Sequence, residues 1–261
     1  TKIVATLGPA TNTKETLIEL ASSGVNVFRI NFSHADYEDV KKRVKQIREI
    51  NQENGYNVAI LADLQGPKLR VGVMEDGVVL EDGDEFVFTT EECVGNNEKA
   101  FMTYQNFPRD VKPGEQILVD DGKLLFEVIS TDKKLKVVTK IIVGGVLSSK
   151  KGVNLPNTNI SLPALTEKDK KDAIFALSLD VDWLALSFVR TPEDLRILRD
   201  LIAQNSKYRV PVIAKIEKPE AVENIDSLIP YCDGLMVARG DLGVEIPMQE
   251  VPLIQKKLVL R

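Results

Sequence analysis

The chemistry that this sequence most readily assembles needs two carboxylates and a lysine, and Glu217, Asp241 and Lys215 supply them. Magnesium in proteins is usually held by one or two carboxylates together with substrate oxygens. A lysine beside such a metal stabilises negative charge on the bound substrate. The structural alternative is that Lys215 and Glu217 form an ion pair and that Asp241 caps a helix. The choice between the two depends on where the rest of the chain places these side chains.

Two buried strands and the helix between them position these residues. Residues 212–216 and 235–238 are apolar runs without the polar alternation of a half-exposed strand, and residues 219–229 have apolar residues at helical spacing. Because side chains two apart on a strand leave the same face, the lysine and the glutamate point the same way. The aspartate follows the second strand in a Gly-rich turn over residues 239–243. The carboxyl ends of parallel strands are where such folds do their chemistry.

The same strand-helix rhythm runs through most of the chain and predicts a parallel α/β sheet. The predicted strands are residues 2–7, 25–30, 57–62, 183–188, 210–217 and 234–238, and the predicted helices are residues 14–22, 36–54, 168–179, 219–229 and 249–260, with one more opened by Thr191-Pro192. Thr166 and Asp169 have the spacing of a capping box. Six such units form either an open doubly wound sheet or a barrel that lacks two of its eight units.

The stretch from residue 71 to residue 160 breaks this rhythm. It reads as short alternating strands joined by Asp-Gly and Gly-Gly turns, among them Asp76-Gly77 and Asp121-Gly122. We therefore expect an all-β insertion, which is suited to act as a lid that excludes water.

Polar side chains also lie at the ends of two earlier strands. They are Arg29, Asn31 and Ser33 at the second strand, and Asp63, Lys68 and Arg70 after the third. A metal site, cations for a phosphate and a lid are the components of phosphoryl transfer, where positioning and charge neutralisation dominate.

His34 is the single histidine, so a relay with a second histidine is excluded, and the sequence has neither a GxGxxG fingerprint nor a Gly-Lys-Ser/Thr phosphate loop.

Composition narrows the class of protein. With 43% hydrophobic and 28% charged residues, the 261 residues are typical of a soluble globular protein, and no apolar run approaches the roughly 20 residues of a membrane span. The net charge of −5 argues against a nucleic-acid partner. Two widely separated cysteines, Cys93 and Cys232, predict a reducing, cytoplasmic setting without disulfides. The start of the chain lacks the pattern of a signal peptide.

Seven segments along the whole chain resemble the pyruvate kinases. They are KIVATLGPAT (2–11), VFRINFSHAD (27–36), LADLQGPKLR (61–70), SKKGVNLP (149–156), ALSFVRTPEDL (185–195), AKIEKPEAVENID (214–226) and MVARGDLGVEIP (236–247). The resemblance implies an α/β (β/α)8 TIM-type barrel, incomplete here with six units, and an inserted small all-β lid domain. Residues 1–70 and 161–261 would form the split barrel, and residues 71–160 the lid.

The same resemblance implies an activity and partners. The reaction is magnesium-dependent phosphoryl transfer from phosphoenolpyruvate to ADP, which gives pyruvate and ATP in the last step of glycolysis. Manganese would substitute for magnesium, and the full-length parent would be a cytoplasmic homotetramer. The family continues after Arg261 with two more barrel units and a C-terminal domain, so we expect this chain to be a fragment whose own activity is open.

Residue roles follow from the matched motifs. Glu217 and Asp241 would bind magnesium, Lys215 would stabilise the transferring phosphoryl group and the enolate, and Arg29 would contact the substrate phosphate. The substrate carboxylate would be bound by Ala238, Arg239, Gly240 and Asp241. The nucleotide would be contacted by Asn31, Phe32, Ser33, His34, Arg70 and Lys151. Asp121 would move with the lid.

One departure concerns a monovalent cation. Many members of the family that this chain resembles have Thr, Lys and Glu where this chain has Leu64, Gln65 and Lys68, and members with the glutamate resemble potassium-dependent enzymes. Their potassium site would use the positions of Asn31, Ser33, Asp63 and Leu64. The ammonium of Lys68 is expected to replace the ion and to make activity largely potassium-independent.

Two other functions are retained. A magnesium-dependent lyase or aldolase of pyruvate-like acids also places a Glu and an Asp on adjacent strands, but that class usually lacks the large insertion and the Arg-Asn-Ser cluster. A non-catalytic fragment of the kinase would bind phosphoenolpyruvate with magnesium and not turn it over.

Overall fold

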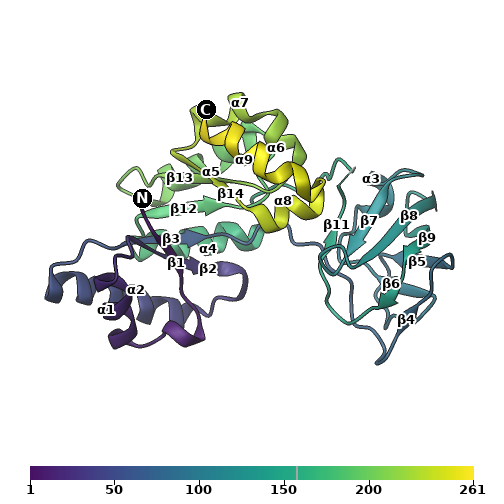
Figure 1. Ribbon diagram of the computed structural model, residues 1–261, viewed down its shortest axis with the longest axis horizontal. Helices are drawn as coiled ribbons and strands as arrows, with labels where there is room; N and C mark the ends of the chain where they lie inside the picture. Colours follow the sequence, from purple (N-terminus) through teal and green to yellow (C-terminus); the bar gives the residue numbers. More distant parts are fainter. Residues whose placement is uncertain (157) are drawn as a thin grey trace. The chain divides into compact units, whose positions relative to one another are not determined.

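A computed structural model of the chain describes residues 1–156 and 158–261, and residue 34 by its backbone only. These residues divide into two compact units (Figure 1). The first unit comprises residues 1–67, 163–216 and 220–237, and the second comprises residues 68–162, 217–219 and 238–261.

A six-stranded parallel sheet organises the first unit. Its strands are β1 (Val4–Thr6), β2 (Val27–Asn31), β3 (Ala59–Asp63), β12 (Trp183–Leu186), β13 (Val212–Ile216) and β14 (Gly234–Val237), and their order in the sheet is their order in the sequence. Doubly wound sheets reverse the strand order at a switch point, whereas successive units of a barrel do not. The order therefore favours the barrel over the open sheet.

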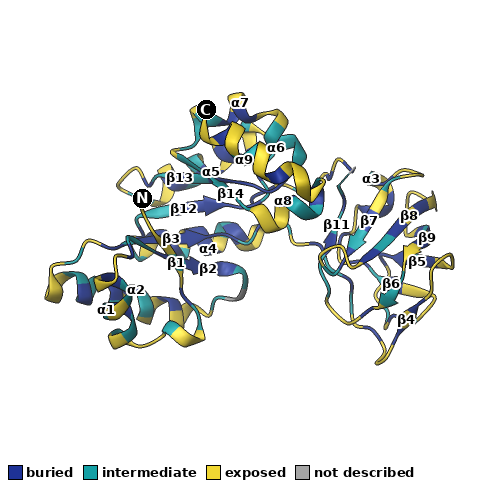
Figure 2. Ribbon diagram, viewed as in Figure 1, coloured by how far each residue is buried: buried dark blue, intermediate teal, exposed yellow. Residues whose placement is uncertain are grey.

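Strands β3, β12 and β13 are mostly buried on both faces, as the lack of polar alternation predicts, whereas every residue of β14 is only partly buried. Leu61 and Ala62 are neighbours on β3 with side chains on opposite faces, and both are fully buried. Figure 2 shows β3, β12 and β13 as largely dark blue. Register places Asn31 opposite Asp63 and Lys215 opposite Met236, so the carboxyl ends of the strands line up.

Local signals define the helices of this unit. These are α1 (Lys14–Ser22), α2 (Tyr37–Asn54), α4 (Glu167–Ser178), α5 (Pro192–Asn205), α6 (Pro219–Glu223) and α7 (Ile225–Leu228). Asp36 caps α2 by accepting from the amides of Glu38 and Asp39, and Gly55 ends it at a φ of 69°. The predicted capping box of Thr166 and Asp169 begins α4 and is confirmed.

The single helix predicted over residues 219–229 is wrong. The structure divides it into α6 and α7 at Asn224, followed by a 3-10 turn at Ile229–Tyr231. The Asn224 side chain donates to the carbonyl of Arg190, and its own carbonyl accepts from the amide of Ser227. A contact outside the segment thus competes with a continuous helix.

The second unit contains the strands of the insertion. They are β4 (Val79–Leu80), β5 (Glu85–Thr89), β6 (Lys99–Phe101), β7 (Gln116–Val119), β8 (Leu124–Thr131), β9 (Lys136–Val143), β10 (Gly145–Val146) and β11 (Val153–Asn154), with the short helix α3 (Phe107–Asp110). Six of them form a sheet in the order β11-β7-β8-β9-β5-β6, and β10 pairs with β4. Its core is aromatic: Phe88 packs edge-on against Phe86, Phe107 and Phe126.

Helices α8 (Arg239–Glu245) and α9 (Val251–Val259) also belong to the second unit, with a 3-10 turn at Met248–Glu250 between them. The predicted Gly-rich turn at 239–243 is therefore wrong, because these residues are the start of α8. Leu242 is fully buried and its amide donates to the carbonyl of Ala238. Burial of this leucine overrides the weak helix propensity of its glycine neighbours. Across the described residues, we find no helix whose length and hydropathy would let it cross a bilayer.

Candidate active site

A buried carboxylate joins two cations at the carboxyl end of the parallel sheet. Asp63, the last residue of β3, is 1% exposed. The Arg29 Nε on β2 donates to Asp63 Oδ2 at 2.6 Å, and Arg29 Nη2 pairs with the same oxygen. The Lys215 Nζ on β13 lies 3.3 Å from Asp63 Oδ1 in an ion pair rather than a hydrogen bond. The three side chains together carry one net positive charge, which suits an anionic substrate.

Two hydroxyl groups complete this network. The Lys215 Nζ donates to Ser187 Oγ at 2.7 Å, and Ser187 Oγ donates to the carbonyl of Leu64 at 2.7 Å. On the other side, Arg29 Nη1 donates to Thr6 Oγ1 at 2.8 Å. The sequence reasoning singled out neither Ser187 nor Thr6. A usable signal exists, because Thr6 ends β1 and Ser187 directly follows β12.

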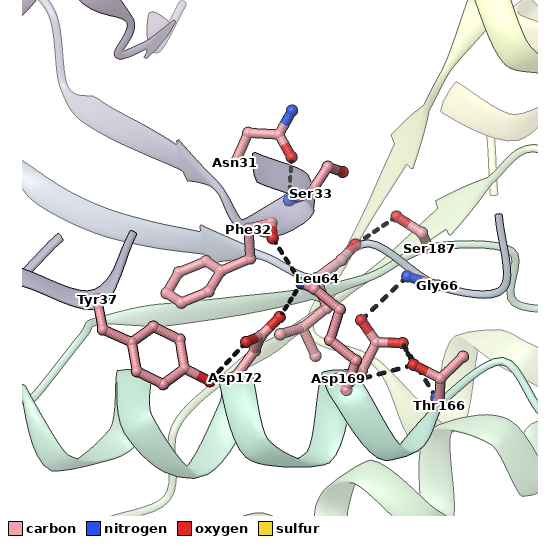
Figure 3. Close-up of polar contacts among 11 residues, drawn as sticks. Asn31, Phe32, Ser33, Tyr37, Leu64, Gly66, Thr166, Asp169, Asp172 and Ser187 are labelled. Atoms are coloured by element: carbon pink, nitrogen blue, oxygen red, sulfur yellow. Dashed lines mark hydrogen bonds and ion pairs between the residues drawn. The ribbon is translucent and has the colours of Figure 1, made fainter. Parts of the chain in front are cut away.

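The turn after β2 is held by helix α4 (Figure 3). The Asn31 Oδ1 accepts from the amide of Ser33 at 3.0 Å, and the carbonyl of buried Phe32 accepts from Lys168 Nζ at 2.8 Å. Lys168 also pairs with Asp172 at 2.5 Å. The segment that carries Asn31, Phe32 and Ser33 is therefore fixed by a cation on α4. The side chain of His34, predicted to lie near a nucleotide, is outside the described part of the chain.

Asp172 has a second partner in Tyr37. The Tyr37 hydroxyl donates to Asp172 Oδ1 at 2.8 Å, and its ring stacks on Phe175 with centroids 4.0 Å apart. Burial, and then the hydrogen bond to Asp172, raises the pKa of Tyr37 to about 12. The loop after β3 is fixed in the same way, because the amide of Gly66 donates to Asp169 Oδ1 at 3.1 Å.

The two predicted magnesium ligands lie in the second unit. Glu217 directly follows β13 and is 1% exposed, whereas Asp241 is exposed in the first turn of α8. Ile216 of β13 pairs in register with Val237 of β14, so both carboxylates come from the ends of neighbouring strands. Two carboxylates together with substrate oxygens are a donor set that suits magnesium. Among the side chains that the structure describes, which leave out that of His34, no cluster of three or more His, Cys, Asp or Glu is suited to a metal.

The predicted nucleotide residues Arg70 and Lys151 belong to the second unit. Arg70 Nη1 donates to the carbonyl of Lys150 at 2.9 Å, and Lys151 Nζ lies 2.9 Å from Asp120 Oδ1. Asp120 also pairs with Lys123, and this hydrogen bond, followed by that of Lys151, lowers its pKa. The sequence analysis named Asp121 and not Asp120, the residue that pairs with Lys151.

The pair Asp120-Asp121 forms an unusual turn. Both have left-handed backbones, with φ of 54° and 57°, and Asp121 is exposed.

Lys68, the residue predicted to replace potassium, is exposed and belongs to the second unit. The monovalent-cation positions Asn31, Ser33, Asp63 and Leu64 all belong to the first.

Comparison with known proteins gives consistent matches over the whole chain. A family model described as "Pyruvate kinase, barrel domain" matches residues 1–261. A pyruvate kinase of Corynebacterium glutamicum is 46% identical over 260 residues, covering 99% of this chain and 54% of the relative. One of Geobacillus stearothermophilus is 46% identical over 261 residues, covering 99% of this chain and 44% of the relative. The chain thus spans about half the length of these curated relatives.

A solved structure supports the same grouping. The crystal structure of a pyruvate kinase from Cryptosporidium parvum superposes with a TM-score of 0.94 at 36% identity and covers 100% of this chain and 55% of its own. The likeness confirms the predicted fold class, an incomplete (β/α)8 barrel of six units with a small β insertion.

Proposed function

Since this chain belongs to the pyruvate kinase family, we propose that its site serves phosphoryl transfer from phosphoenolpyruvate to ADP, in a parent enzyme that yields pyruvate and ATP. The observation that carries the proposal is the buried cluster of Arg29, Asp63 and Lys215 at the carboxyl end of the sheet. Phosphoenolpyruvate has a phosphate and a carboxylate, and a net positive cluster attracts both. Barrel enzymes bind their substrates at this end of the strands.

The chemistry requires charge neutralisation more than covalent participation by the protein. An oxygen of the ADP β-phosphate forms a bond to the phosphorus while the bond from phosphorus to the enol oxygen breaks. The enol oxygen leaves with the bonding electrons, and the enolate then takes up a proton to become pyruvate. Arg29 neutralises the phosphoryl oxygens, and Lys215 stabilises the transferring group and the enolate. Asp63 holds both cations in place.

Magnesium or manganese fits the donor set of Glu217 and Asp241. A bound divalent ion supplies further charge neutralisation for the phosphoryl oxygens. Ala238 precedes α8, and Arg239 and Gly240 are its first two residues, next to Asp241 in the sequence; the amides of these three residues are assigned to the substrate carboxylate. For the nucleotide we retain Arg70 and Lys151, together with residues 31–34, and Asp121 is assigned to the lid over residues 71–160.

We further propose that potassium is dispensable. Three of the oxygen sites expected for this ion already accept hydrogen bonds or ion pairs from protein groups. Asn31 Oδ1 accepts from Ser33, Asp63 pairs with Arg29 and Lys215, and the carbonyl of Leu64 accepts from Ser187. The ammonium of Lys68 is assigned the role of the missing ion. The parent enzyme is proposed to be a cytoplasmic homotetramer.

The test is an assay of the purified chain with phosphoenolpyruvate, ADP and magnesium, with ATP formation as the readout. Lys215→Met is expected to abolish the signal, whereas Lys14→Met, at an exposed ion pair on α1, leaves it unchanged. Magnesium-dependent binding of phosphoenolpyruvate without ATP would favour the non-catalytic fragment. Cleavage or condensation of a pyruvate-like acid without ATP would favour the lyase.

A further inference from the structure

The hydroxyl of Ser187 is a buried link between the predicted catalytic lysine and the backbone after β3. Ser187 is 1% exposed and Lys215 is 8% exposed. We propose that Ser187 is a positioning residue, which sets the direction of the Lys215 ammonium. This inference rests on the proposed function, because it assigns the ammonium to the transferring phosphoryl group.

The two hydrogen bonds of Ser187 determine the direction in which its hydroxyl proton points. The carbonyl of Leu64 can only accept, so the Ser187 hydroxyl proton points at that carbonyl, 2.7 Å away. The oxygen lone pairs are then turned toward Lys215 Nζ, also at 2.7 Å. Ser187 therefore accepts from the ammonium and cannot donate to it. The Lys215 ammonium therefore donates to a neutral oxygen, Ser187 Oγ, whose lone pairs have a fixed direction.

The backbone around Ser187 is built to keep the hydroxyl there. Phe188 adopts a left-handed backbone with φ of 55°, which is uncommon for a bulky side chain. Gly66, at φ of 72°, passes close to this turn: a Cβ at Gly66 would lie 2.7 Å from Phe188 Cδ2 and 3.0 Å from Ser187 Cβ. The amide of Leu64 donates to the carbonyl of Ala185 at 3.0 Å, which fixes the acceptor itself. A strained residue maintained by close packing is typical of a functional site.

Asp63 and Ser187 have different effects on the same lysine. Asp63 supplies the opposite charge from 3.3 Å, but an ion pair of this length constrains direction weakly. Ser187 supplies a short hydrogen bond, which restricts rotation of the flexible lysine chain. Since phosphoryl transfer depends on placement of charge, a displaced ammonium slows the reaction even when its charge remains.

The experiment compares Ser187→Ala and Ser187→Cys with the unmodified chain. Ser178→Ala is the matched control, because its exposed hydroxyl also donates to a backbone carbonyl, that of Phe175, at a helix end. Thermal unfolding followed by circular dichroism checks that each variant folds. The first readout is the proton–nitrogen NMR signal of the Lys215 ammonium in 15N-lysine-labelled protein, assigned by its loss in Lys215→Arg.

Ammonium protons of Lys215 are expected to exchange with water about tenfold or more faster in Ser187→Ala, with Ser187→Cys between it and the unmodified chain. The second readout is turnover. The kcat is expected to fall about ten- to hundredfold in Ser187→Ala, while KM for phosphoenolpyruvate changes little, as for loss of one hydrogen bond to a charged group.

Unchanged ammonium exchange in folded Ser187→Ala, or faster exchange with unchanged kcat, would overturn the positioning role. If the unmodified chain forms no ATP, that outcome bears on the proposed function and its alternatives and not on Ser187, and the NMR readout still tests the hydrogen bond between Ser187 and Lys215. A purely structural serine would lower thermal stability without altering the ammonium signal.

Discussion

Glu245 and Lys218 form an ion pair that water barely reaches, and neutralising the glutamate tests how much the second unit depends on it. The Lys218 Nζ lies 2.8 Å from Glu245 Oε2, with side-chain exposures of 6% and 1%. The Nδ2 of Asn154, in strand β11, donates to Glu245 Oε1 at 2.7 Å. The pair therefore ties the segment after β13 and helix α8 to the last strand of the insertion.

The expected cost of Glu245→Gln follows from this burial. Glutamine has a single side-chain oxygen. If that oxygen still accepts from Asn154, the amide NH2 faces the Lys218 ammonium; if the amide is flipped, Lys218 gains a neutral acceptor and the hydrogen bond from Asn154 is lost. An uncompensated buried charge costs about 3–5 kcal/mol, far more than an exposed pair. The double variant Lys218→Met with Glu245→Gln removes the buried charge altogether. We expect it to recover most of the loss, because well-packed neutral replacements of buried pairs are often close to neutral in stability.

Urea unfolding followed by circular dichroism measures the free energy of unfolding of the single and double variants. Hydrogen exchange of residues 152–155 reports separately on β11. The control is Glu193→Gln, which breaks an exposed pair with Arg196, 3.5 Å apart, and is expected to cost less than about 1 kcal/mol. If Glu245→Gln costs no more than Glu193→Gln, or if the double variant is less stable than Glu245→Gln, the reasoning from burial is refuted.

Three further outcomes are expected. Turnover should be nearly the same in potassium and in tetramethylammonium buffer, and Lys68→Glu should make it depend on potassium; strong activation of the unmodified chain by potassium would contradict the assignment. Glu217→Gln and Asp241→Asn should each weaken manganese binding, followed by electron paramagnetic resonance, by roughly tenfold or more, since each removes one charged ligand; unchanged binding would exclude that residue as a ligand. Burial, and then its hydrogen bond to a carboxylate, raises the pKa of Tyr104 to about 12 from an ordinary 10.0. The neutral Tyr104 hydroxyl stabilises the folded state fully below the unfolded-state pKa, and this stabilisation is lost as the pH rises through the folded-state pKa. The free energy of unfolding should therefore fall by about 3 kcal/mol between about pH 10 and 12, a loss that is absent in Tyr104→Phe.

The helices show what local sequence determines. Helix α2 begins after Asp36 and ends before Gly55, and α4 begins at the capping box of Thr166 and Asp169. Caps, turn residues and periodicity act within one or two turns of chain, so their residues are readable without the fold. Local reasoning failed over 219–229 and 239–243, where the Asn224 bond to Arg190 and the burial of Leu242 decide the structure.

The sequence by itself determined the types of strand and helix, the charged residues at the strand ends and, by its motifs, the family. It did not determine which of these residues touch. The contacts of Asp63 with Arg29 and Lys215, and the hydrogen bond of Lys215 to Ser187, join segments far apart in the chain. They exist because β2, β3, β12 and β13 pair in one register, and a shift of one residue would turn each of these side chains to the other face. Register is set by the packed sheet as a whole, so only the tertiary structure decides it.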